Sequence, residues 1–335
     1  MAILVLSLVL VIGCTSEKLV ISEEKEKFDG KFVDRPMEPS EQEGIQVTEK
    51  GVKYLVHPSK IIGGGPPKDG IPSIDNPKYV SVEEANEWIA DNELVLAITY
   101  KGVQRVYPLQ ILVWHEIVND KIAGDPLLIT YCPLCGSGIA FERTIELGGK
   151  RVETEFGTSG KLYNSNLVMY DRKTDTYWTQ IDGLAIVGEL TEQELIPVSI
   201  DTVVWRDWKK AHPDSEVLSQ NTGFARQYGK DPYGNYYEDS FLIFPVEKQD
   251  DRIHSKTVIF GIEVNGQYKA YKEEDLIEKE VIIDIVNGVN VKVERDEAGT
   301  VKITDVDTGK EIVKERDFWF AWYAFHPETE LYETK

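Results

Sequence analysis

The chain has 335 residues, 41% of them hydrophobic, and its formal net charge is −21 at pH 7. This length allows one large domain or two ordinary ones, each with a buried core. Because the acidic residues are spread along the chain, its surface repels phosphate backbones, which argues against any nucleic-acid-binding function.

An apolar run opens the chain, extends from Ala2 to Ile12 and is followed by Gly13 and Cys14. The run is too short for a spanning helix, which needs about 20 apolar residues. It is typical of a secretory signal, and the VIGC box resembles a lipoprotein signal, although no Lys or Arg precedes the run. We expect a signal peptide over 1–13 and a lipid on Cys14. The protein would then be anchored to the cell membrane on its extracytoplasmic face. The alternative is a chance cysteine after an apolar N-terminus.

Two segments with little regular structure should precede the folded body. Residues 14–45 are charged and poor in apolar residues, which predicts an acidic, flexible tether. Residues 46–77 form a lead-in dense in Gly and Pro, which predicts irregular backbone. A short helix should follow over 81–91, because Ser81 can cap it and Glu84 can complete a capping box.

The body contains an internal repeat. The segment LAITYKGVQRVYPLQIL (96–112) aligns without gaps with FGIEVNGQYKAYKEEDL (260–276), at an offset of 164 residues. Further along, 203–218 resembles 317–332, so the second copy is shorter by about 50 residues. An internal duplication would explain both similarities.

We therefore predict two related lobes that share a framework. The first lobe covers 78–222, a connection covers 223–254, and a shortened second lobe covers 255–335. Both lobes should begin with a hairpin of β-branched and apolar strands around a KG or NG turn. Helical stretches are few, around 107–114, 202–211 and 271–279. The predicted class is α+β with β dominant.

Two cysteines lie three positions apart in LLITYCPLCGSG (127–138). If the segments around 114–119 and 127–132 pair as antiparallel strands, position 118 faces 128, and His115 comes close to Cys132. Two residues between the thiolates let both sulfurs of Cys132 and Cys135 point at one centre. Thiolates and imidazole are ligands of zinc and of Cu(I). We expect these three residues to bind copper or zinc, and the second lobe lacks all three.

Two other interpretations of the cysteine pair stay open. Outside the cytoplasm disulfides persist, so the pair could be an oxidised staple that only closes a loop. It could also exchange thiol for disulfide, because CxxC motifs lower thiol pKa values. The protein is accordingly a metal-binding protein, a thiol redox protein, or a binding or structural lipoprotein, and the sequence leaves open whether it is an enzyme.

Polar and aromatic residues gather in GTSGKLYNSNLVMYDRKTDTYWTQIDG (157–183), which the second lobe lacks. A pocket needs a few directed polar groups, although the same residues also suit a pair of strands. The candidate substrate-binding residues are Ser159, Tyr163, Asn164, Asp171, Trp178 and Gln180.

Several motifs follow one another in the order of a known family. WHEIVND, TYCPLCGSGIAF, SGKLYNSNLVMYDR, YWTQ and HPDSEVLS together resemble the family called domain of unknown function 3179, over about 57–335. That family consists largely of exported or lipid-anchored prokaryotic proteins. The resemblance therefore implies a location, and it implies no reaction.

Overall fold

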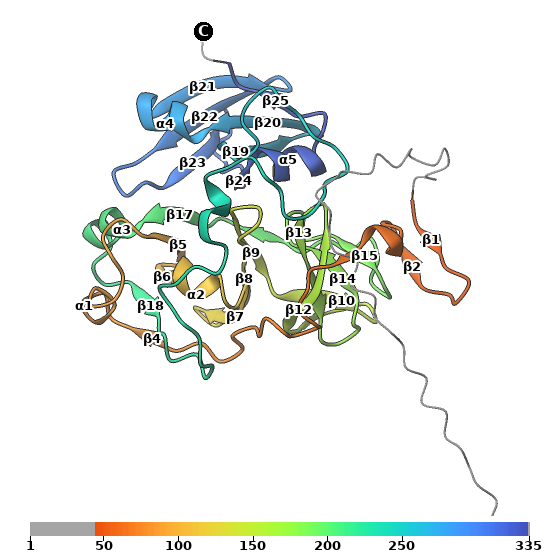
Figure 1. Ribbon diagram of the computed structural model, residues 1–335. Coiled ribbons are helices and arrows are strands. Elements are labelled where there is room, and N and C mark those ends of the chain that lie inside the picture. Colours follow the sequence, from red (N-terminus) through yellow and green to blue (C-terminus); the bar gives the residue numbers. More distant parts are fainter. Residues whose placement is uncertain (1–43, 334–335) are drawn as a thin grey trace, which may run out of the picture. The chain divides into compact units, whose positions relative to one another are not determined.

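The structure is a computed structural model that describes residues 44–333. The predicted signal peptide, Cys14 and nearly all of the tether lie outside the described residues. The predicted α+β class with β dominant is confirmed, because strands alternate with only five short α-helices in the described part (Figure 1). None of the helices between residues 44 and 333 is long and apolar enough to cross a membrane.

A five-stranded sheet forms the framework of the first lobe, in the order β17-β5-β6-β18-β4. Its strands are β4 (Tyr79–Val80), β5 (Leu94–Tyr100), β6 (Val103–Pro108), β17 (Asp201–Val204) and β18 (Glu216–Leu218). The hairpin between β5 and β6 turns at Lys101 and Gly102, which both have positive φ, as a two-residue turn of this hand requires.

Three short helices accompany this sheet: α1 (Val82–Ala85), α2 (Leu109–Leu112) and α3 (Trp205–Ala211). The predicted capping box starts α1, since the Ser81 hydroxyl accepts from the Glu84 N–H and the Glu84 carboxylate accepts from the Ser81 N–H. The helix ends sooner than expected, because the chain turns after Ala85 to reach β5.

A second sheet, in the order β16-β9-β8-β7, carries the cysteine motif. Its strands are β7 (Ile117–Ile122), β8 (Asp125–Cys132), β9 (Ser137–Glu142) and β16 (Pro197–Val198). Val118 pairs with Ile129 rather than with position 128, so the predicted register is wrong by one residue. Side chains of β8 alternate between two cores, with Tyr131 on one face and Cys132 on the other.

The segment missing from the second lobe and the lead-in together build a seven-stranded sheet, in the order β1-β2-β15-β14-β13-β12-β3. Its strands are β1 (Gln46–Val47), β2 (Lys53–Tyr54), β3 (Ile62–Gly63), β12 (Phe156–Tyr163), β13 (Asn166–Asp171), β14 (Tyr177–Thr179) and β15 (Ala185–Val187). A hairpin of β10 (Thr144–Leu147) and β11 (Lys150–Glu153) stands apart, and a 3-10 turn covers Pro58–Lys60.

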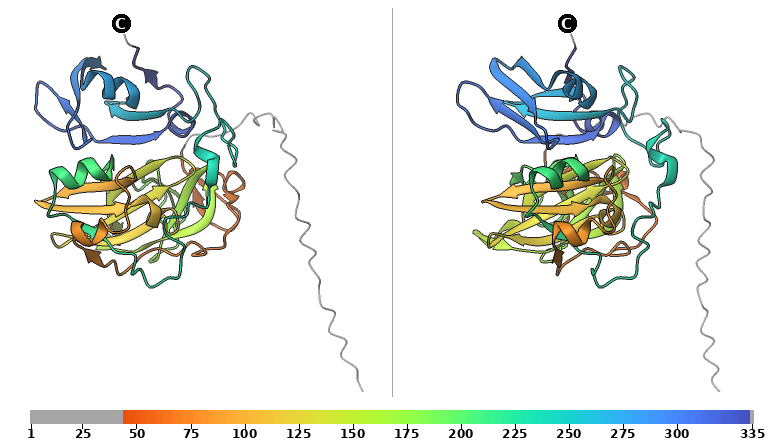
Figure 2. Two further views of the ribbon diagram at one scale, coloured as in Figure 1. Left: turned by 60° about the vertical axis from the view of Figure 1, so that its left-hand side comes forward. Right: turned by 90° about the vertical axis from the view of Figure 1, so that its left-hand side faces the viewer.

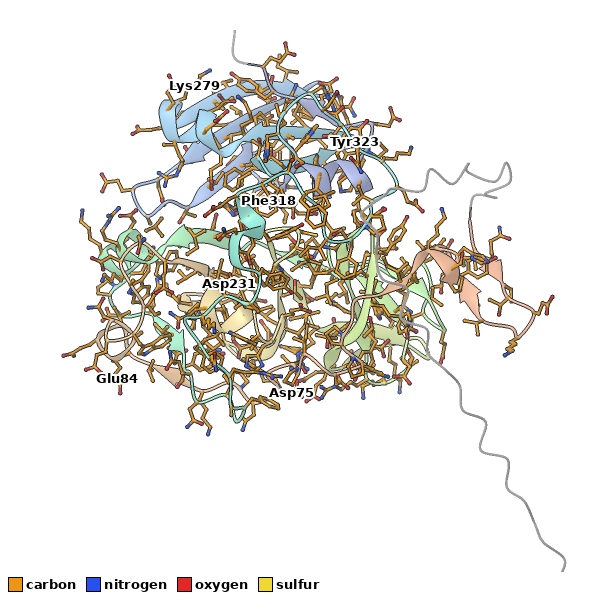
Figure 3. All side chains as sticks on the ribbon, in the orientation of Figure 1. Asp75, Glu84, Asp231, Lys279, Phe318 and Tyr323 are labelled. Atoms are coloured by element: carbon orange, nitrogen blue, oxygen red, sulfur yellow. The ribbon has the colours of Figure 1, made fainter. Side chains whose placement is uncertain are left out.

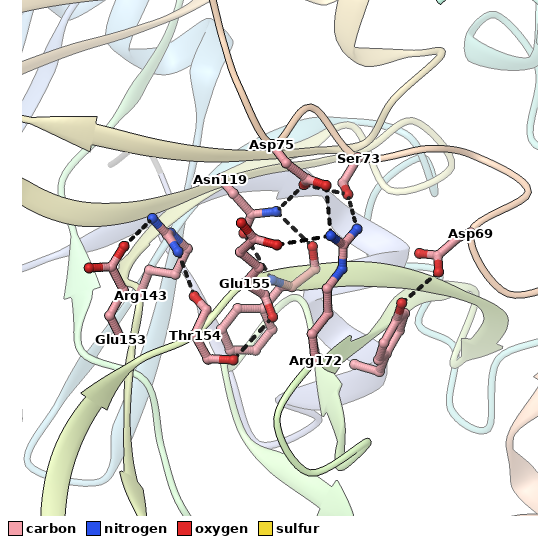
Figure 4. Close-up of polar contacts among 11 residues, drawn as sticks. Asp69, Ser73, Asp75, Asn119, Arg143, Glu153, Thr154, Glu155 and Arg172 are labelled. Atoms are coloured by element: carbon pink, nitrogen blue, oxygen red, sulfur yellow. Dashed lines mark hydrogen bonds and ion pairs between the residues drawn. The ribbon is translucent and has the colours of Figure 1, made fainter.

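A polar network fastens the Gly- and Pro-rich lead-in to this sheet (Figure 4). Arg172 donates to Asp75, to Ser73 and to Glu155 over 2.7–2.9 Å. The Asn119 side chain donates to Asp75 at 2.7 Å and exchanges two hydrogen bonds with the backbone of Phe156. The lead-in contains three two-residue strands and a 3-10 turn within otherwise irregular backbone. It is held by side chains of Asn119 on β7 and of Arg172, which follows β13.

The second lobe contains a four-stranded and a three-stranded sheet, in the orders β24-β19-β20-β25 and β21-β22-β23. The strands are β19 (Val258–Val264), β20 (Gln267–Lys272), β21 (Val281–Val286), β22 (Val289–Arg295), β23 (Val301–Asp305), β24 (Lys314–Phe318) and β25 (Glu330–Leu331). The helices are α4 (Glu273–Lys279) and α5 (Trp319–Phe325). In both views of Figure 2 these blue strands form sheets of their own.

The two lobes have the same strand order and the same pairing. β17-β5-β6-β18 corresponds to β24-β19-β20-β25, with antiparallel pairs in the same register and a parallel last pair in each lobe. The shared framework is thus present in the fold, and a duplication as its origin stays a prediction. Phe318 and Phe320 of the second lobe pack in one core with Cys132 and Cys135 of the first.

Candidate functional site

The cysteine motif forms a tight turn between two central strands. β8 ends at Cys132 and β9 begins at Ser137, and these two residues pair with each other. Within the turn, the Cys135 N–H donates to the Cys132 carbonyl at 3.1 Å. Gly136 has φ +64, and a Cβ there would come within 2.9 Å of the Phe318 ring. Glycine therefore allows both the backbone turn and the close approach of β24.

Both cysteines are free thiols, and both are buried. The two sulfurs face one acceptor, the Ser165 carbonyl, at 3.9 Å from Cys132 and 3.5 Å from Cys135. The Asn166 amide donates to the Cys135 sulfur at 3.5 Å. Burial raises the pKa of the Cys135 thiol well above its usual range, and hydrogen bonding to Cys132 adds to the shift. The Cys135 thiol is accordingly protonated at pH 7.

A two-residue hairpin turn presents this carbonyl. Asn164 and Ser165, which join β12 to β13, both have positive φ, as such a turn requires. The Ser165 hydroxyl is buried and has no hydrogen-bond partner among the described residues. A buried hydroxyl without a partner costs free energy, so this group needs an explanation, such as a role at a functional site.

A chain of buried amides and hydroxyls continues from the sulfurs. The Asn166 amide and the Ser137 hydroxyl both donate to the Gln180 side-chain oxygen, at 2.7 and 3.0 Å. The Gln180 amide donates in turn to the Thr130 hydroxyl at 3.0 Å. The cysteine pair therefore lies at one end of a polar network within an apolar core.

A buried carboxyl group of the second lobe, that of Asp317, lies beside the cysteine turn. β24 lies alongside β9, and the Phe318 N–H donates to the Cys135 carbonyl at 2.8 Å. The neighbouring Asp317 is fully buried, and neither of its carboxyl oxygens has a hydrogen-bond partner in the described part of the chain. Burial raises the pKa of Asp317 to about 8, while the charge of Arg316 opposes the shift.

Other titratable groups lie in the same region. Burial raises the pKa of Glu315, which is on the same strand as Asp317, and the charges of Asp317 and Asp182 add to the shift. Burial raises the pKa of Asp182 to about 7. The His326 ring nitrogen Nε2 lies 3.4 Å from Asp182 Oδ1, and burial lowers the pKa of His326 to about 4. At pH 7 this region of the core therefore holds a mostly protonated Asp317, a half-protonated Asp182 and a neutral His326 imidazole.

The structure does not bring His115 to the cysteines. Its Nδ1 lies 2.7 Å from the Pro72 carbonyl and its Nε2 lies 2.7 Å from the Tyr228 hydroxyl. Glu116 has φ +58 and β7 begins only at Ile117, so the backbone turns before the strand and the ring leaves the cysteine face. Between residues 44 and 333, no group of three or more His, Cys, Asp or Glu side chains is placed to hold a metal.

The candidate substrate-binding residues are mostly occupied with holding the seven-stranded sheet together. The Ser159 hydroxyl bonds to the Val168 carbonyl, and Asp171 accepts from two backbone N–H groups and from the Trp178 indole. Asn164 bonds to the backbone of Ala324 and Glu247, and the Tyr163 hydroxyl donates to Glu247. Gln180 alone among the six contacts the network at the cysteines.

A pocket of about 580 Å³ lies next to the cysteine turn. Tyr131 and Gly136, which flank the two cysteines, form one wall. The facing walls come from the connection, with Asp231, and from β24, with Phe318; both are labelled in Figure 3. The sequence did not reveal this pocket, because the walls come from segments far apart along the chain. The only signal was the cluster of tyrosines after Asp231.

One comparison with known proteins finds a match. The model of a protein family of unknown function, DUF3179, matches residues 68–314. No curated protein and no solved structure matches the chain.

Proposed function

The chain belongs to the DUF3179 family of proteins of unknown function, and from the geometry of its thiol pair we propose that it binds Cu(I) through Cys132 and Cys135. The observation that carries this proposal is that both free thiols face the same carbonyl oxygen, that of Ser165. Two sulfurs held against one point provide a soft, two-donor site.

The donor set supports copper over zinc. Thiolates select soft ions such as Cu(I). A structural zinc site needs four ligands and a catalytic one needs three, whereas the described residues offer no set of three. With His115 bonded to Pro72 and Tyr228, the proposed site contains two sulfurs.

Binding releases protons. Two Cys–SH groups and one Cu⁺ give a bis-thiolate copper complex with one negative charge and two H⁺. Because the pKa of Cys135 is raised, protons compete with the metal at neutral pH. Because binding releases two protons, the affinity should rise with pH, by up to about 100-fold for each pH unit. When the Asp317 carboxyl group is ionised, its charge raises the pKa of the Cys135 thiol further.

The site would act outside the cytoplasm. If Cys14 carries a lipid, the folded body would be tethered to the extracytoplasmic face of the cell membrane by an acidic segment. Stable anchoring needs more than one acyl chain. In that location Cys132 and Cys135 would be the two cysteines left free to bind metal.

A thiol–disulfide reaction is the second candidate, because the two thiols also hydrogen-bond to each other. The pair would lose two electrons and two protons to form a disulfide, and a disulfide of a partner protein would gain both and become two thiols. Reactive cysteines are partly exposed and have lowered pKa values, whereas these are buried and Cys135 has a raised one. This favours the metal proposal.

The experiment is a Cu(I) titration of the purified protein without oxygen, against a chromogenic Cu(I) chelator. We expect one Cu(I) per chain in the wild type and a loss of at least 100-fold in affinity in Cys132→Ser and in Cys135→Ser. The matched control His115→Gln should keep one Cu(I) per chain. Equal affinity in the wild type and the double cysteine variant would overturn the proposal. Loss of copper in His115→Gln would restore the three-ligand site.

A further inference from the structure

The pocket beside the cysteine turn has an aromatic lining that the copper proposal does not use. Tyr131, Tyr237 and Phe318 all line it, and the ring centroids of Tyr237 and Phe318 are 6.4 Å apart. No residue in the described part of the chain hydrogen-bonds the Tyr131 hydroxyl, which makes it available to a ligand. A volume of about 580 Å³ is that of a small-molecule site.

The charged groups of the lining are mainly acidic. Asp231 accepts from the Tyr233 N–H at 2.8 Å and from the Tyr237 hydroxyl at 3.1 Å. These bonds hold its carboxylate beside the aromatic rings. Glu93 also lines the pocket and accepts from the Gln110 side chain at 2.6 Å. These hydrogen bonds fix the positions of both carboxylates.

The one arginine of the lining does not offset these charges. Arg316 donates from Nε and NH2 to both oxygens of Glu273, at 2.8 and 3.0 Å. A bidentate pair of this kind neutralises the guanidinium. An anionic ligand would thus meet two carboxylates and an arginine that is already paired, whereas a cation would meet carboxylates and aromatic faces.

We propose that this pocket binds a small organic cation, in which an ammonium group is attached to an apolar or aromatic body. The ammonium group lies by Asp231 and the face of Tyr237, because aromatic faces and carboxylates both attract cations. The apolar body packs on Phe318 and Tyr131. This inference is independent of the copper site, since none of these side chains contributes a sulfur.

The test uses benzyltrimethylammonium as the probe, with benzyl alcohol and benzoate as neutral and anionic comparisons, and measures binding by calorimetry. We expect the cation to bind at least tenfold more tightly than benzyl alcohol and benzoate to show no binding. Added salt should weaken binding of the cation.

Two variants locate the site. Asp231→Asn keeps the shape of the side chain and should weaken binding of the cation about tenfold. Tyr237→Leu should weaken it at least fivefold through loss of the ring. The control Asp214→Asn changes an exposed carboxylate outside the pocket and should bind as the wild type does. Benzoate binding as tightly as the cation, or unchanged affinity in both pocket variants, would overturn the proposal. Measuring copper binding in the same variants tests the proposed cysteine site separately.

Discussion

Asp317 shows at the scale of one residue how burial sets chemistry in this protein. Its carboxyl group is enclosed beside the cysteine turn without a hydrogen-bond partner from residues 44–333. Burial disfavours the charged form, and the pKa of Asp317 is raised to about 8. The ordinary value for an aspartate is about 4, so the folded state holds a proton that the unfolded chain releases.

The first prediction concerns Asp317→Asn. Because the folded pKa is raised, the stabilisation that this proton gives is complete below about pH 4 and is lost as pH rises through about 8. Between pH 6.5 and pH 8, the free energy of unfolding of the wild type should fall by about 2 kcal/mol more than that of Asp317→Asn. His326, with a lowered pKa of about 4, is neutral in this range. Urea unfolding followed by tryptophan fluorescence at both pH values measures the difference.

Asp214→Asn, at an exposed position, is the control and should follow the wild type at both pH values. Equal slopes in Asp317→Asn and the wild type would mean that Asp317 is charged in the folded protein.

At the scale of elements, one arrangement of side chains occurs in both lobes. In the first lobe Tyr107 and Arg105 donate to Asp120, and in the second the Tyr271 hydroxyl donates to Asp284 at 3.2 Å. Each aspartate also accepts from the next backbone N–H. These contacts fasten the first hairpin of each lobe to the hairpin that follows, which explains why the framework persists where the cysteines are absent.

The second prediction compares Asp120→Asn with Asp284→Asn. Asp120 is 3% exposed and its partner Arg105 is 8% exposed. Arg105 keeps its ion pair with Glu216, but Asp120→Asn removes the buried charged acceptor of both the Arg105 guanidinium and the Tyr107 hydroxyl. This should lower the free energy of unfolding by about 3 kcal/mol. The Asp284 side chain is 20% exposed and lies 3.6 Å from Lys269. Asp284→Asn should therefore lower the free energy of unfolding by only about 1 kcal/mol. Chemical denaturation of both variants gives the comparison; equal losses would contradict it.

At the scale of the whole molecule, the lobes are joined by buried polar contacts as well as by a shared core. Lys314 on β24 lies 3.0 Å from Asp201 on β17, and its side chain is 3% exposed. The same carboxylate accepts from the Val301 N–H at 3.0 Å. Strand β17 of the first lobe's framework sheet thus contacts β24, the corresponding strand of the second lobe.

The third prediction is that Asp201→Asn weakens the contact between the lobes. The amide can still accept from Val301, but Lys314 would be left as a buried charge without a counter-charge, which costs about 3–5 kcal/mol. Relative to the wild type, amide hydrogen exchange should speed up more in β23 and β24 than in β5 and β6. The control is Asp91→Asn, whose exposed ion pair with Lys209 contributes little. Uniform exchange in all four strands would contradict the prediction.

Local sequence patterns were enough to predict the class, four of the five α-helices in the described part and the framework common to both lobes, although α1 is shorter than expected and α5 (Trp319–Phe325) was missed. Each of these depends on local patterns: apolar strands, turn residues such as Lys101–Gly102, and the capping box at Ser81. The match at an offset of 164 residues predicted corresponding strands, and strand order and register agree with it.

Which residues meet at the site became evident only from the three-dimensional fold. The register of β7 against β8 differed by one residue from the prediction, and the positive φ of Glu116 turned His115 toward Pro72 and Tyr228. Asp317, by contrast, reached the cysteine turn from far along the chain. Side-chain alternation makes a one-residue shift reverse a face, and long-range packing leaves no local pattern, so neither could be predicted from the sequence alone.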